Sequence, residues 1–395
     1  MTATTLSTDQ AKARDTIHAA LRRGQREIVL AGPAGSGKTT LMRTLLADLR
    51  ADGKNVVLMA PTGKAAARLR DLTGGSTSTI HQLLYSRVWE NDEGKPVFSD
   101  PSAVAAAGSV LIVDEASMVG RSLHFDLIEH LPKGVQVLWV GDREQLPPVL
   151  DTWGPNFDQP TALLDQVHRQ AAESPIIRLA TAIRQGDDWR AVPNAPGYHR
   201  AKSTIGKVGA WAARRRDAGN DVVLLTFTNK VRHELNASVR RQRGHACELH
   251  TDDRLVSLFN SYSLGIMNGE QRTVRSLEAG PAGFTHVELV EGGHALVRPD
   301  LFGCETDEWK AAVDALKAAN PVLDYSEMPA WRLAMRADLG ECLTVHKSQG
   351  SQWRLVCFVA DPMLRMIGRR DSETYRRVLY TAVTRASDSL FIAET

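Results

Sequence analysis

The chain of 395 residues is long enough for roughly two or three domains, and its 43% hydrophobic and 24% charged residues are typical of a globular protein. A net charge of +2 gives no overall field that would indicate nucleic acid as a partner. The N-terminal stretch MTATTLSTDQAKARD is too polar for a signal peptide, and the apolar runs fall short of the ~20 residues that span a bilayer. Four cysteines without C-x-x-C spacing argue against a disulfide framework or structural zinc. We therefore expect a cytoplasmic protein without a membrane partner.

Short apolar strands alternate with amphipathic helices in the first half of the chain. A helix between the first two strands carries Met42, Leu45, Leu46 and Leu49 on one stripe. Continuous apolar strands between helices are typical of a parallel sheet covered on both faces. The predicted strands lie at residues 27–31, 56–60, 110–114 and 135–140.

The strand and helix pattern restarts after about residue 172, with strands predicted at 221–228, 355–360 and 389–394. Between 247 and 333, polar and apolar residues alternate and are interrupted by glycine, which favours a small antiparallel barrel. The sequence therefore predicts two α/β lobes with a β-rich insertion in the second. Arginine clusters at 214–216, 240–243 and 365–370 are more often solvated faces than binding sites.

A glycine-rich segment, GPAGSGKT (32–39), follows the first predicted strand and opens the next helix. It fits G-x-x-x-x-G-K-[ST], in which backbone N–H groups and the helix N-terminus surround phosphates. Lys38 is expected to reach the β- and γ-phosphates and Thr39 to ligate Mg²⁺. The predicted ATP-binding residues here are Gly32, Pro33, Ala34, Gly35, Ser36, Gly37, Lys38, Thr39 and Thr40.

Two acidic residues end another predicted strand in VLIVDEAS (110–117). We expect Asp114 to hold Mg²⁺ through water and Glu115 to act as the general base toward an attacking water. Alone, this pair is also compatible with a plain strand exit. Together with the P-loop it predicts an ATPase.

A glutamine lies in the loop that follows the strand VQVLWV, in GDREQLPPV (141–149). Because the carboxyl ends of parallel strands share one edge of a sheet, Gln145 is expected close to Lys38 and Asp114. Pro147 and Pro148 stiffen the chain after it, so a shift at Gln145 would be transmitted. The alternative is an ordinary proline-ended turn.

Nine segments in order resemble the motifs of superfamily 1 helicases, specifically the RecD-like, 5′-to-3′ group. They are LSTDQAKA (6–13), GPAGSGKTT (32–40), APTGKAAARL (60–69), STSTIHQLL (76–84), IVDEASMV (112–119), WVGDREQLPPV (139–149), VHRQ (167–170), LTVHKSQGSQW (343–353) and YTAVTRAS (380–387). The resemblance implies two RecA-like P-loop lobes, the first at 1–84 and 103–171 and the second at 172–246 and 334–395. It also implies a β-hairpin insertion at 85–102 and an SH3-like β-barrel insertion at 247–333.

The resemblance also implies roles at the nucleotide site. Gln10 would contact adenine, and Gln145 would couple the γ-phosphate to the DNA groove. Arg169 and Arg385 would be arginine fingers that stabilise charge on the transferred phosphate, although Arg385 is also compatible with a surface salt bridge. Gln352 stands where the family usually carries an acidic residue, so nucleotide affinity or sugar discrimination is expected to differ. The predicted catalytic set is thus Lys38, Asp114, Glu115, Gln145, Arg169 and Arg385.

The expected partners are single-stranded and forked DNA. By resemblance the DNA-binding residues are Thr62, Lys64, Thr79, His81, Asn229, Thr344, His346, Lys347 and Trp353. The two histidines and Trp353 are also compatible with core positions. Trp89 and Phe98 of the hairpin would separate the strands, the alternative being a plain solvated hairpin.

The sequence thus predicts an ATP- and Mg²⁺-dependent DNA helicase that moves 5′-to-3′ on single-stranded DNA. We expect it to function as a monomer in a bacterial or phage-infected cytosol, with replication or recombination proteins as partners. Two alternatives stay open, an RNA helicase or remodeller of the same superfamily and a nucleotide-switched DNA-binding module.

Overall fold

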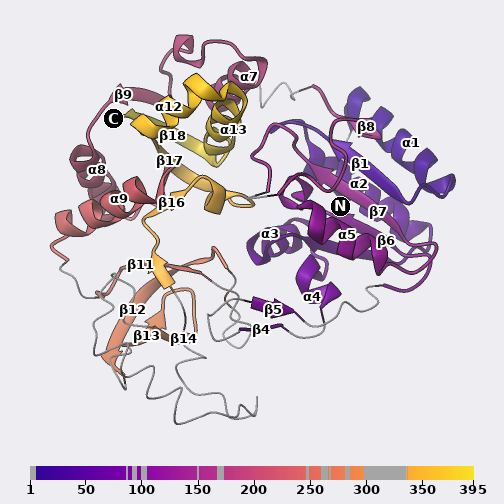
Figure 1. Cartoon of the computed structure of the whole chain (residues 1–395), viewed down its shortest axis with the longest axis horizontal. Helices are drawn as coiled ribbons and strands as arrows, with labels where there is room; N and C mark the ends of the chain where they lie inside the picture. Colours follow the sequence, from indigo (N-terminus) through magenta and orange to yellow (C-terminus); the bar gives the residue numbers. More distant parts are fainter. Residues whose placement is uncertain are drawn as a thin grey trace. The chain divides into compact units, whose positions relative to one another are not determined.

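The computed structural model describes residues 6–85, 88–90, 96–98, 105–148, 151–166, 173–245, 249–258, 266, 268–280, 285–297, 335 and 337–395, with only the backbone at 88–90 and 96–98. The chain forms two compact units (Figure 1). Unit 1 consists of Met1–His199, Gln349–Gln352 and Leu364–Leu390. Unit 2 consists of Arg200–Ser348, Trp353–Met363 and Phe391–Thr395. None of the described helices is long and apolar enough to cross a membrane.

Unit 1 is built on a six-stranded sheet in the order β3-β2-β6-β7-β1-β8. Every neighbouring pair in it is parallel. The four strands predicted in this half are confirmed as β1, β2, β6 and β7. The two short edge strands, β3 and β8, were not predicted. The strands are β1 (Glu27–Ala31), β2 (Val56–Ala60), β3 (Thr77–Thr79), β6 (Val110–Val113), β7 (Gln136–Gly141) and β8 (Ala162–Leu163).

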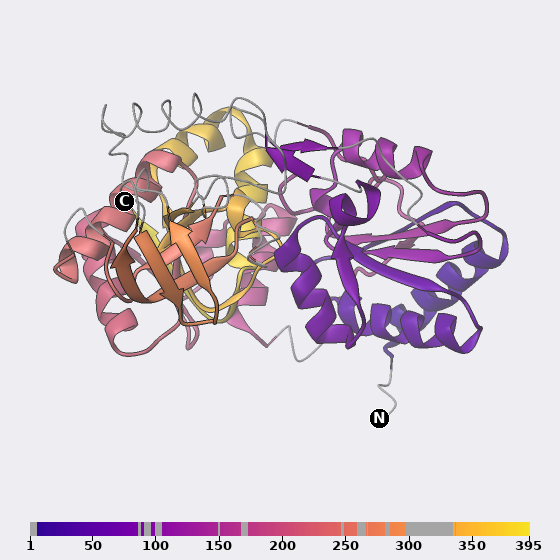
Figure 2. The ribbon, with the colours of Figure 1, turned by 90° about the horizontal axis from the view of Figure 1, so that it is seen from below.

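Helices cover both faces of this sheet (Figure 2). Alternate strand residues, such as Ile28 and Leu138, pack with α1 (Thr8–Arg22) and α2 (Lys38–Ala51) on one face. Their neighbours pack with α4 and α5 on the other face. Strand residues are therefore buried on both sides, which explains their continuous apolar sequence. Further elements of unit 1 are α3 (Gly63–Thr73), α4 (Ile80–Leu84), β4 (Val88–Glu90), β5 (Pro96–Phe98), η1 (Ala116–Met118), α5 (Arg121–Glu129), α7 (Pro175–Gln185), η2 (Trp189–Ala191), α13 (Ser372–Val383) and most of α12 (Pro362–Arg370).

Residues that the sequence assigned to the second lobe contribute to unit 1. Helix α7 contacts α13, and Trp189 Nε1 donates to Tyr375 Oη at 3.3 Å. These packing contacts join distant parts of the chain, so a boundary drawn along the sequence does not reveal them.

A second sheet has the strand order β16-β10-β17-β18-β9. Strand β10 pairs in parallel with both β16 and β17. Leu224 of β10 packs with Val208 of α8 and Leu235 of α9 in one apolar cluster. The elements are β9 (Tyr198–Lys202), α8 (Ile205–Asp217), β10 (Val222–Thr226), α9 (Asn229–Gln242), β16 (Cys342–Thr344), η6 (His346–Ser348), β17 (Trp353–Ala360) and β18 (Ala386–Glu394).

The β-rich region of unit 2 is an antiparallel sheet in the order β14-β13-β12-β11-β15. A further bridge joins Val297 of β14 to Met335, two residues before β15. Leu255, Val274 and Val287 form its apolar core. The strands are β11 (Arg254–Ser257), β12 (Gln271–Ala279), β13 (Thr285–Leu289), β14 (His294–Val297) and β15 (Ala337–Leu339).

Candidate active site

The P-loop joins β1 to α2 at the carboxyl edge of the first sheet. Gly35 and Gly37 have φ angles of 79° and 80°, which glycine adopts without strain. Lys38 Nζ donates to the carbonyl oxygens of Gly32 at 2.6 Å and Pro33 at 3.1 Å. The loop therefore already surrounds the lysine charge, and the first turn of α2 presents Thr39 and Thr40.

Gln10 contacts this loop from α1. Its side chain is 2% exposed, and Nε2 donates to the carbonyl oxygen of Gly37 at 3.1 Å. Its Oε1 accepts from the backbone N–H of Ser7 and completes the N-terminal cap of α1. Gln10 is thus placed beside the P-loop, where its role toward adenine stays a prediction.

Asp114 and Glu115 follow β6 at the same edge. Burial, with a smaller contribution from the Glu115 charge, raises the pKa of Asp114 to about 6, and Lys38 opposes this rise. Glu115 has φ 52° and ψ 34°, a left-handed conformation that costs a non-glycine residue on the order of 1–3 kcal/mol. Such strain is commonly kept at functional sites.

The residues present fit a Mg²⁺ ion that is shared with a phosphate group. Within the described residues, no three His, Cys, Asp or Glu side chains group to hold a metal by themselves. Mg²⁺ usually needs only one or two carboxylates, with water and phosphate oxygens completing its shell. Asp114 supplies a half-buried carboxylate and Thr39 a hydroxyl at the start of α2.

The loop after β7 places Gln145 in a buried position, 5% exposed. Its side-chain oxygen Oε1 has no hydrogen-bond partner among the described residues. A buried unpaired acceptor is costly, by about 1–3 kcal/mol, so a group that donates to it on ligand binding would relieve that cost.

Helix α13 holds the loop on either side of Gln145. Tyr380 Oη donates to Asp142 Oδ2 at 2.7 Å and accepts from the P-loop N–H of Ala34 at 2.8 Å. Leu146 N–H donates to Thr381 Oγ1 at 3.0 Å. The P-loop, the Gln145 loop and α13 are therefore tied together inside unit 1.

Arg385 follows α13 and is 3% exposed. Its guanidinium donates to the carbonyl oxygens of Thr381 and Ser351 and to the hydroxyl of Thr384, each at 3.1 Å. Burial lowers its pKa, and the Glu115 charge opposes that effect. Arg385 is thus a buried charge held mainly by neutral oxygens. Arg169, the other predicted finger, lies outside the described residues.

Sequence reasoning missed Tyr380, Asp142, Thr381 and Arg68 as members of this site. Arg68 of α3 donates from Nη2 to Gln352 Oε1 at 2.8 Å, and its Nη1 is 3.8 Å from Glu115 Oε1. All four lie within the quoted motif segments. Only the three-dimensional contacts distinguish them from neighbouring residues of those segments.

The predicted DNA-binding residues of unit 1 lie on α3 and around α4. Thr62 and Thr79 cap these helices by accepting from the N–H groups of Ala65 and Gln82, and Thr79 is buried. Lys64 is on the first turn of α3, and burial lowers the pKa of His81. Capping explains why these threonines occur here whether or not they contact DNA.

The predicted DNA-binding residues of unit 2 include both exposed and buried side chains. Asn229 begins α9 and is exposed. Thr344 Oγ1 accepts from Lys347 N–H at 3.3 Å, and the ring of His346 lies 6.0 Å from that of Phe227. Trp353 is 6% exposed and donates from Nε1 to Gln271, which favours the core alternative for this ring.

The predicted hairpin at 85–102 is described in part. Strands β4 and β5 pair antiparallel, with Val88 opposite Phe98 and Trp89 opposite Val97. The side chains of Trp89 and Phe98 lie outside the described part, so their role stays a prediction.

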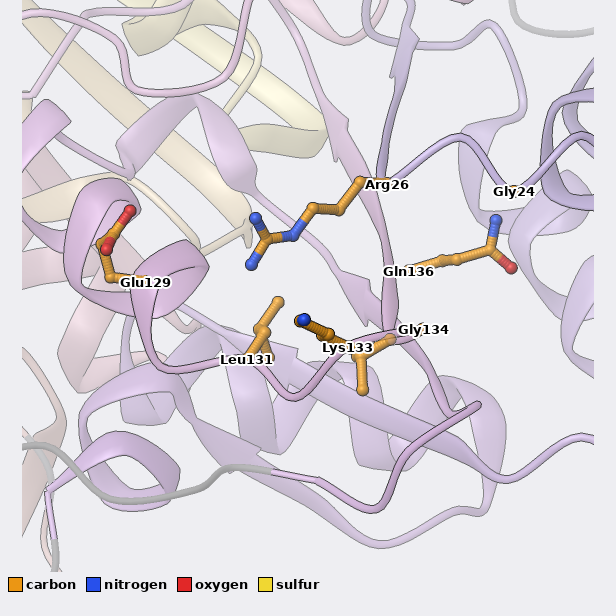
Figure 3. Close-up of a pocket in the computed structure, with 8 residues that line it drawn as sticks. Gly24, Arg26, Glu129, Leu131, Lys133, Gly134 and Gln136 are labelled. Atoms are coloured by element: carbon orange, nitrogen blue, oxygen red, sulfur yellow. The ribbon is translucent and has the colours of Figure 1, made fainter.

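A hollow of about 530 Å³ lies at the other edge of the unit 1 sheet, where β1 and β7 begin (Figure 3). Arg26 projects into it and donates to the carbonyl oxygen of Ile128. Ligands of parallel α/β sheets bind at the carboxyl ends of the strands, so this hollow is separate from the candidate site. It is lined by Gly24, Arg26, Glu129, Leu131, Lys133, Gly134, Val135 and Gln136.

Comparison with known proteins gives two family matches. Residues 5–196 match the model of an AAA domain, and residues 339–393 match that of a UvrD-like helicase C-terminal domain. The first match contains the P-loop, Glu115 and Gln145. The second contains Gln352, the whole of α13 and Arg385.

Curated relatives are similar along most of the chain. It is 31% identical to the ATP-dependent RecD2 DNA helicase of Deinococcus radiodurans, over 98% of this chain and 49% of the relative. It is 31% identical to the ATP-dependent DNA helicase dda of Enterobacteria phage T4, over 61% of this chain and 58% of the relative. It is 27% identical to the RecBCD enzyme subunit RecD of Mycolicibacterium smegmatis, over 91% of this chain and 66% of the relative. The chain thus spans about half to two thirds of these relatives.

Solved structures agree in fold. A Pif1 helicase from Bacteroides in complex with ADP-AlF3 and single-stranded DNA superposes with a TM-score of 0.54 at 18% identity, covering 98% of this chain and 92% of that chain. The fold is α/β with parallel sheets, consistent with that of P-loop helicases. The comparisons confirm the predicted resemblance to the RecD-like group of superfamily 1 helicases.

Proposed function

We propose that the chain is an ATP- and Mg²⁺-dependent DNA helicase that moves 5′-to-3′ on single-stranded DNA and unwinds duplex DNA. The observation that carries the proposal is the convergence of Lys38, Asp114, Glu115, Gln145 and Arg385 in one unit. The printed names of the curated relatives, ATP-dependent DNA helicases, support the same activity.

Each of these residues has a distinct task in phosphoryl transfer to water. The P-loop N–H groups and Lys38 hold the β- and γ-phosphates. Asp114 and Thr39 would hold Mg²⁺, which when bound would neutralise charge on the phosphate oxygens. Glu115 accepts the proton of the attacking water, and Gln145 orients that water through its unpaired Oε1. Arg385 and Arg169 stabilise the charge that develops on the γ-phosphate.

The finer architecture is also part of the proposal. We infer two RecA-like lobes at 1–84 with 103–171 and at 172–246 with 334–395, a hairpin at 85–102 that separates strands, and an SH3-like barrel at 247–333. The antiparallel pairing of β4 with β5 supports the hairpin. The five antiparallel strands and the Val297–Met335 bridge support the barrel.

The proposed substrates are single-stranded and forked DNA, bound through Thr62, Lys64, Thr79, His81, Asn229, Thr344, His346 and Lys347. A sequence-independent grip needs donors for phosphates, which these side chains and their helix ends provide. We further propose a monomer in a bacterial or phage-infected cytosol that acts with replication or recombination proteins.

ATP turnover measured with single-stranded DNA, with RNA of the same sequence and with neither tests this function. Strong stimulation by DNA is expected, with Glu115→Gln as the inactive control. Stimulation by RNA alone would favour an RNA helicase. Turnover that stays slow with every nucleic acid would favour a nucleotide-switched binding module.

A further inference from the structure

Arg68 connects residues from three predicted motifs, yet no motif assigns it a role. It lies on α3, one helical turn after Lys64. Its guanidinium donates to Gln352 at 2.8 Å and lies 3.8 Å from the Glu115 carboxylate. The Arg68 side chain is 36% exposed and that of Glu115 is 17% exposed. Because Glu115 is largely shielded from water, the guanidinium acts on it more strongly than a surface charge would.

Arg68 is a group that the structure places beside the Glu115 carboxylate. Its backbone is left-handed, at φ 52°, immediately after β6. Within the described residues, the ion pair that the structure gives Glu115 is with Arg68. A general base must point at the water it deprotonates, and a small misplacement reduces its effect.

We propose that Arg68 is a positioning residue that orients the Glu115 carboxylate toward the attacking water. The proposal rests on the function proposed above. Arg68 acts through Glu115 and does not itself receive the proton or contact the reacting phosphate.

Gln352 determines how much of the Arg68 charge is available to Glu115. Its Oε1 accepts one N–H from the guanidinium, and its Nε2 donates to the carbonyl oxygen of Thr384 at 3.4 Å. An amide orients the guanidinium without neutralising it. A carboxylate at position 352 would instead form an ion pair with Arg68 and compete with Glu115 for it.

Helix α3 also links Arg68 to the proposed DNA contacts. Thr62, the N-cap, and Lys64, one turn before Arg68, are two proposed DNA contacts at the start of this helix. The proposed contacts to a DNA strand and Arg68, the partner of Glu115, thus lie on the same helix. We therefore expect the DNA-stimulated rate to depend on Arg68 more than the DNA-independent rate does.

The first test compares Arg68→Gln with Arg70→Gln, an exposed arginine on the same helix. At saturating DNA, Arg68→Gln should lower kcat by about ten-fold, part of the ~100-fold or more that a positioned general base contributes. KM for ATP and DNA affinity should each change by less than about two-fold, because neither the phosphate contacts nor the DNA contacts are removed. Arg68→Lys should recover part of the rate, since it keeps a charge but not the fork of donors. Arg70→Gln should match the wild type.

The second test is a double-mutant cycle with Gln352→Glu. Alone, this change should lower kcat several-fold by drawing Arg68 away from Glu115. In the Arg68→Gln background it should have no further effect.

Three results would overturn the proposal. One is an unchanged kcat in Arg68→Gln. Another is additivity of the two substitutions. The third is a loss of DNA affinity that fully accounts for the lower rate, which would make Arg68 a DNA contact. If the wild type itself shows no DNA-stimulated turnover, the proposed function fails first and the inference falls with it.

Discussion

Buried arginines are held differently in the two units. In unit 2, the buried Arg240 and Arg232 pair with Asp253 and Asp338, and the half-buried Arg216 pairs with Glu341. In unit 1, Arg385 is hydrogen-bonded to two carbonyl oxygens and a hydroxyl. A carboxylate partner neutralises the charge of a buried arginine. A buried arginine that is hydrogen-bonded only to neutral groups keeps its attraction for an anion. The comparison suggests that unit 2 uses arginine for structure and that unit 1 keeps a charge for a phosphate.

The same contrast explains two of the arginine clusters in the sequence. Arg216 and Arg240 come from the clusters at 214–216 and 240–243, and both are turned inward to carboxylates. Their neighbours Arg214 and Arg241 are exposed. A run of arginines therefore divides between a solvated face and internal ion pairs, which composition alone does not reveal.

The largest effect is expected from Lys38→Ala, which removes the charge that the P-loop surrounds. ATP hydrolysis should be abolished, because backbone N–H groups cannot replace a positive charge on the β,γ-bridge. Single-stranded DNA binding should survive, because its proposed contacts lie elsewhere. Radiolabelled ATP turnover and fluorescence anisotropy with a labelled oligonucleotide measure the two properties. Near-normal turnover would remove the P-loop from the mechanism.

The comparison of arginines is tested most sharply by Arg385→Gln and Arg240→Gln. The first should lower kcat on the order of 1,000-fold, the lower range for an arginine finger. The second should leave Asp253 buried without its arginine and destabilise the fold by about 3–5 kcal/mol. Arg385→Gln should lose turnover and keep its melting temperature, whereas Arg240→Gln should lose melting temperature. ATP turnover and thermal melting of both variants measure these properties. A similar loss of melting temperature in both would show that Arg385 is structural too.

Gln145→Ala should reduce DNA-stimulated turnover on the order of 100-fold, as the loss of one oriented hydrogen-bonding group can. Its Oε1 has no partner among the described residues, so little internal bonding is lost. Gln136→Ala, at the start of β7, the strand that precedes this loop, is the matched control. Its Nε2 donates to Leu21 and Gln25, so that variant should lose stability and keep its turnover. Parallel loss of turnover, DNA binding and melting temperature in Gln145→Ala would make its loop structural.

The smallest effect is expected from Phe98→Ala in the hairpin, a part of unit 1 with no role in nucleotide chemistry. A ring stacked on the terminal base pair offsets part of the unstacking cost, on the order of 1–3 kcal/mol per base. Unwinding should slow several-fold, while translocation and stimulated ATP turnover stay nearly intact. Stopped-flow assays measure unwinding and translocation. Unchanged unwinding, or equal loss of all three activities, would contradict a strand-separating role.

The sequence predicted the sheet of unit 1 well because its strands carry continuous apolar runs. It placed Lys38, Asp114 and Gln145 at one edge because each follows such a strand. It did not predict that α13 ties the P-loop to the Gln145 loop, since Tyr380 and Asp142 meet across 238 positions. Nor did it predict the Arg68 contact with Gln352, which spans 284 positions. Periodicity reports local structure, whereas these contacts depend on how distant segments pack.

The central claim, a motor that moves 5′-to-3′ on DNA, is tested most directly by unwinding of duplexes that carry a single-stranded tail. Two substrates of identical duplex sequence would carry either a 5′ or a 3′ tail and be mixed with ATP and Mg²⁺. We expect strand separation of the 5′-tailed duplex, little separation of the 3′-tailed one and none of either with Lys38→Ala. Separation of the 3′-tailed duplex instead, or of neither duplex despite DNA-stimulated ATP turnover, would contradict the central claim.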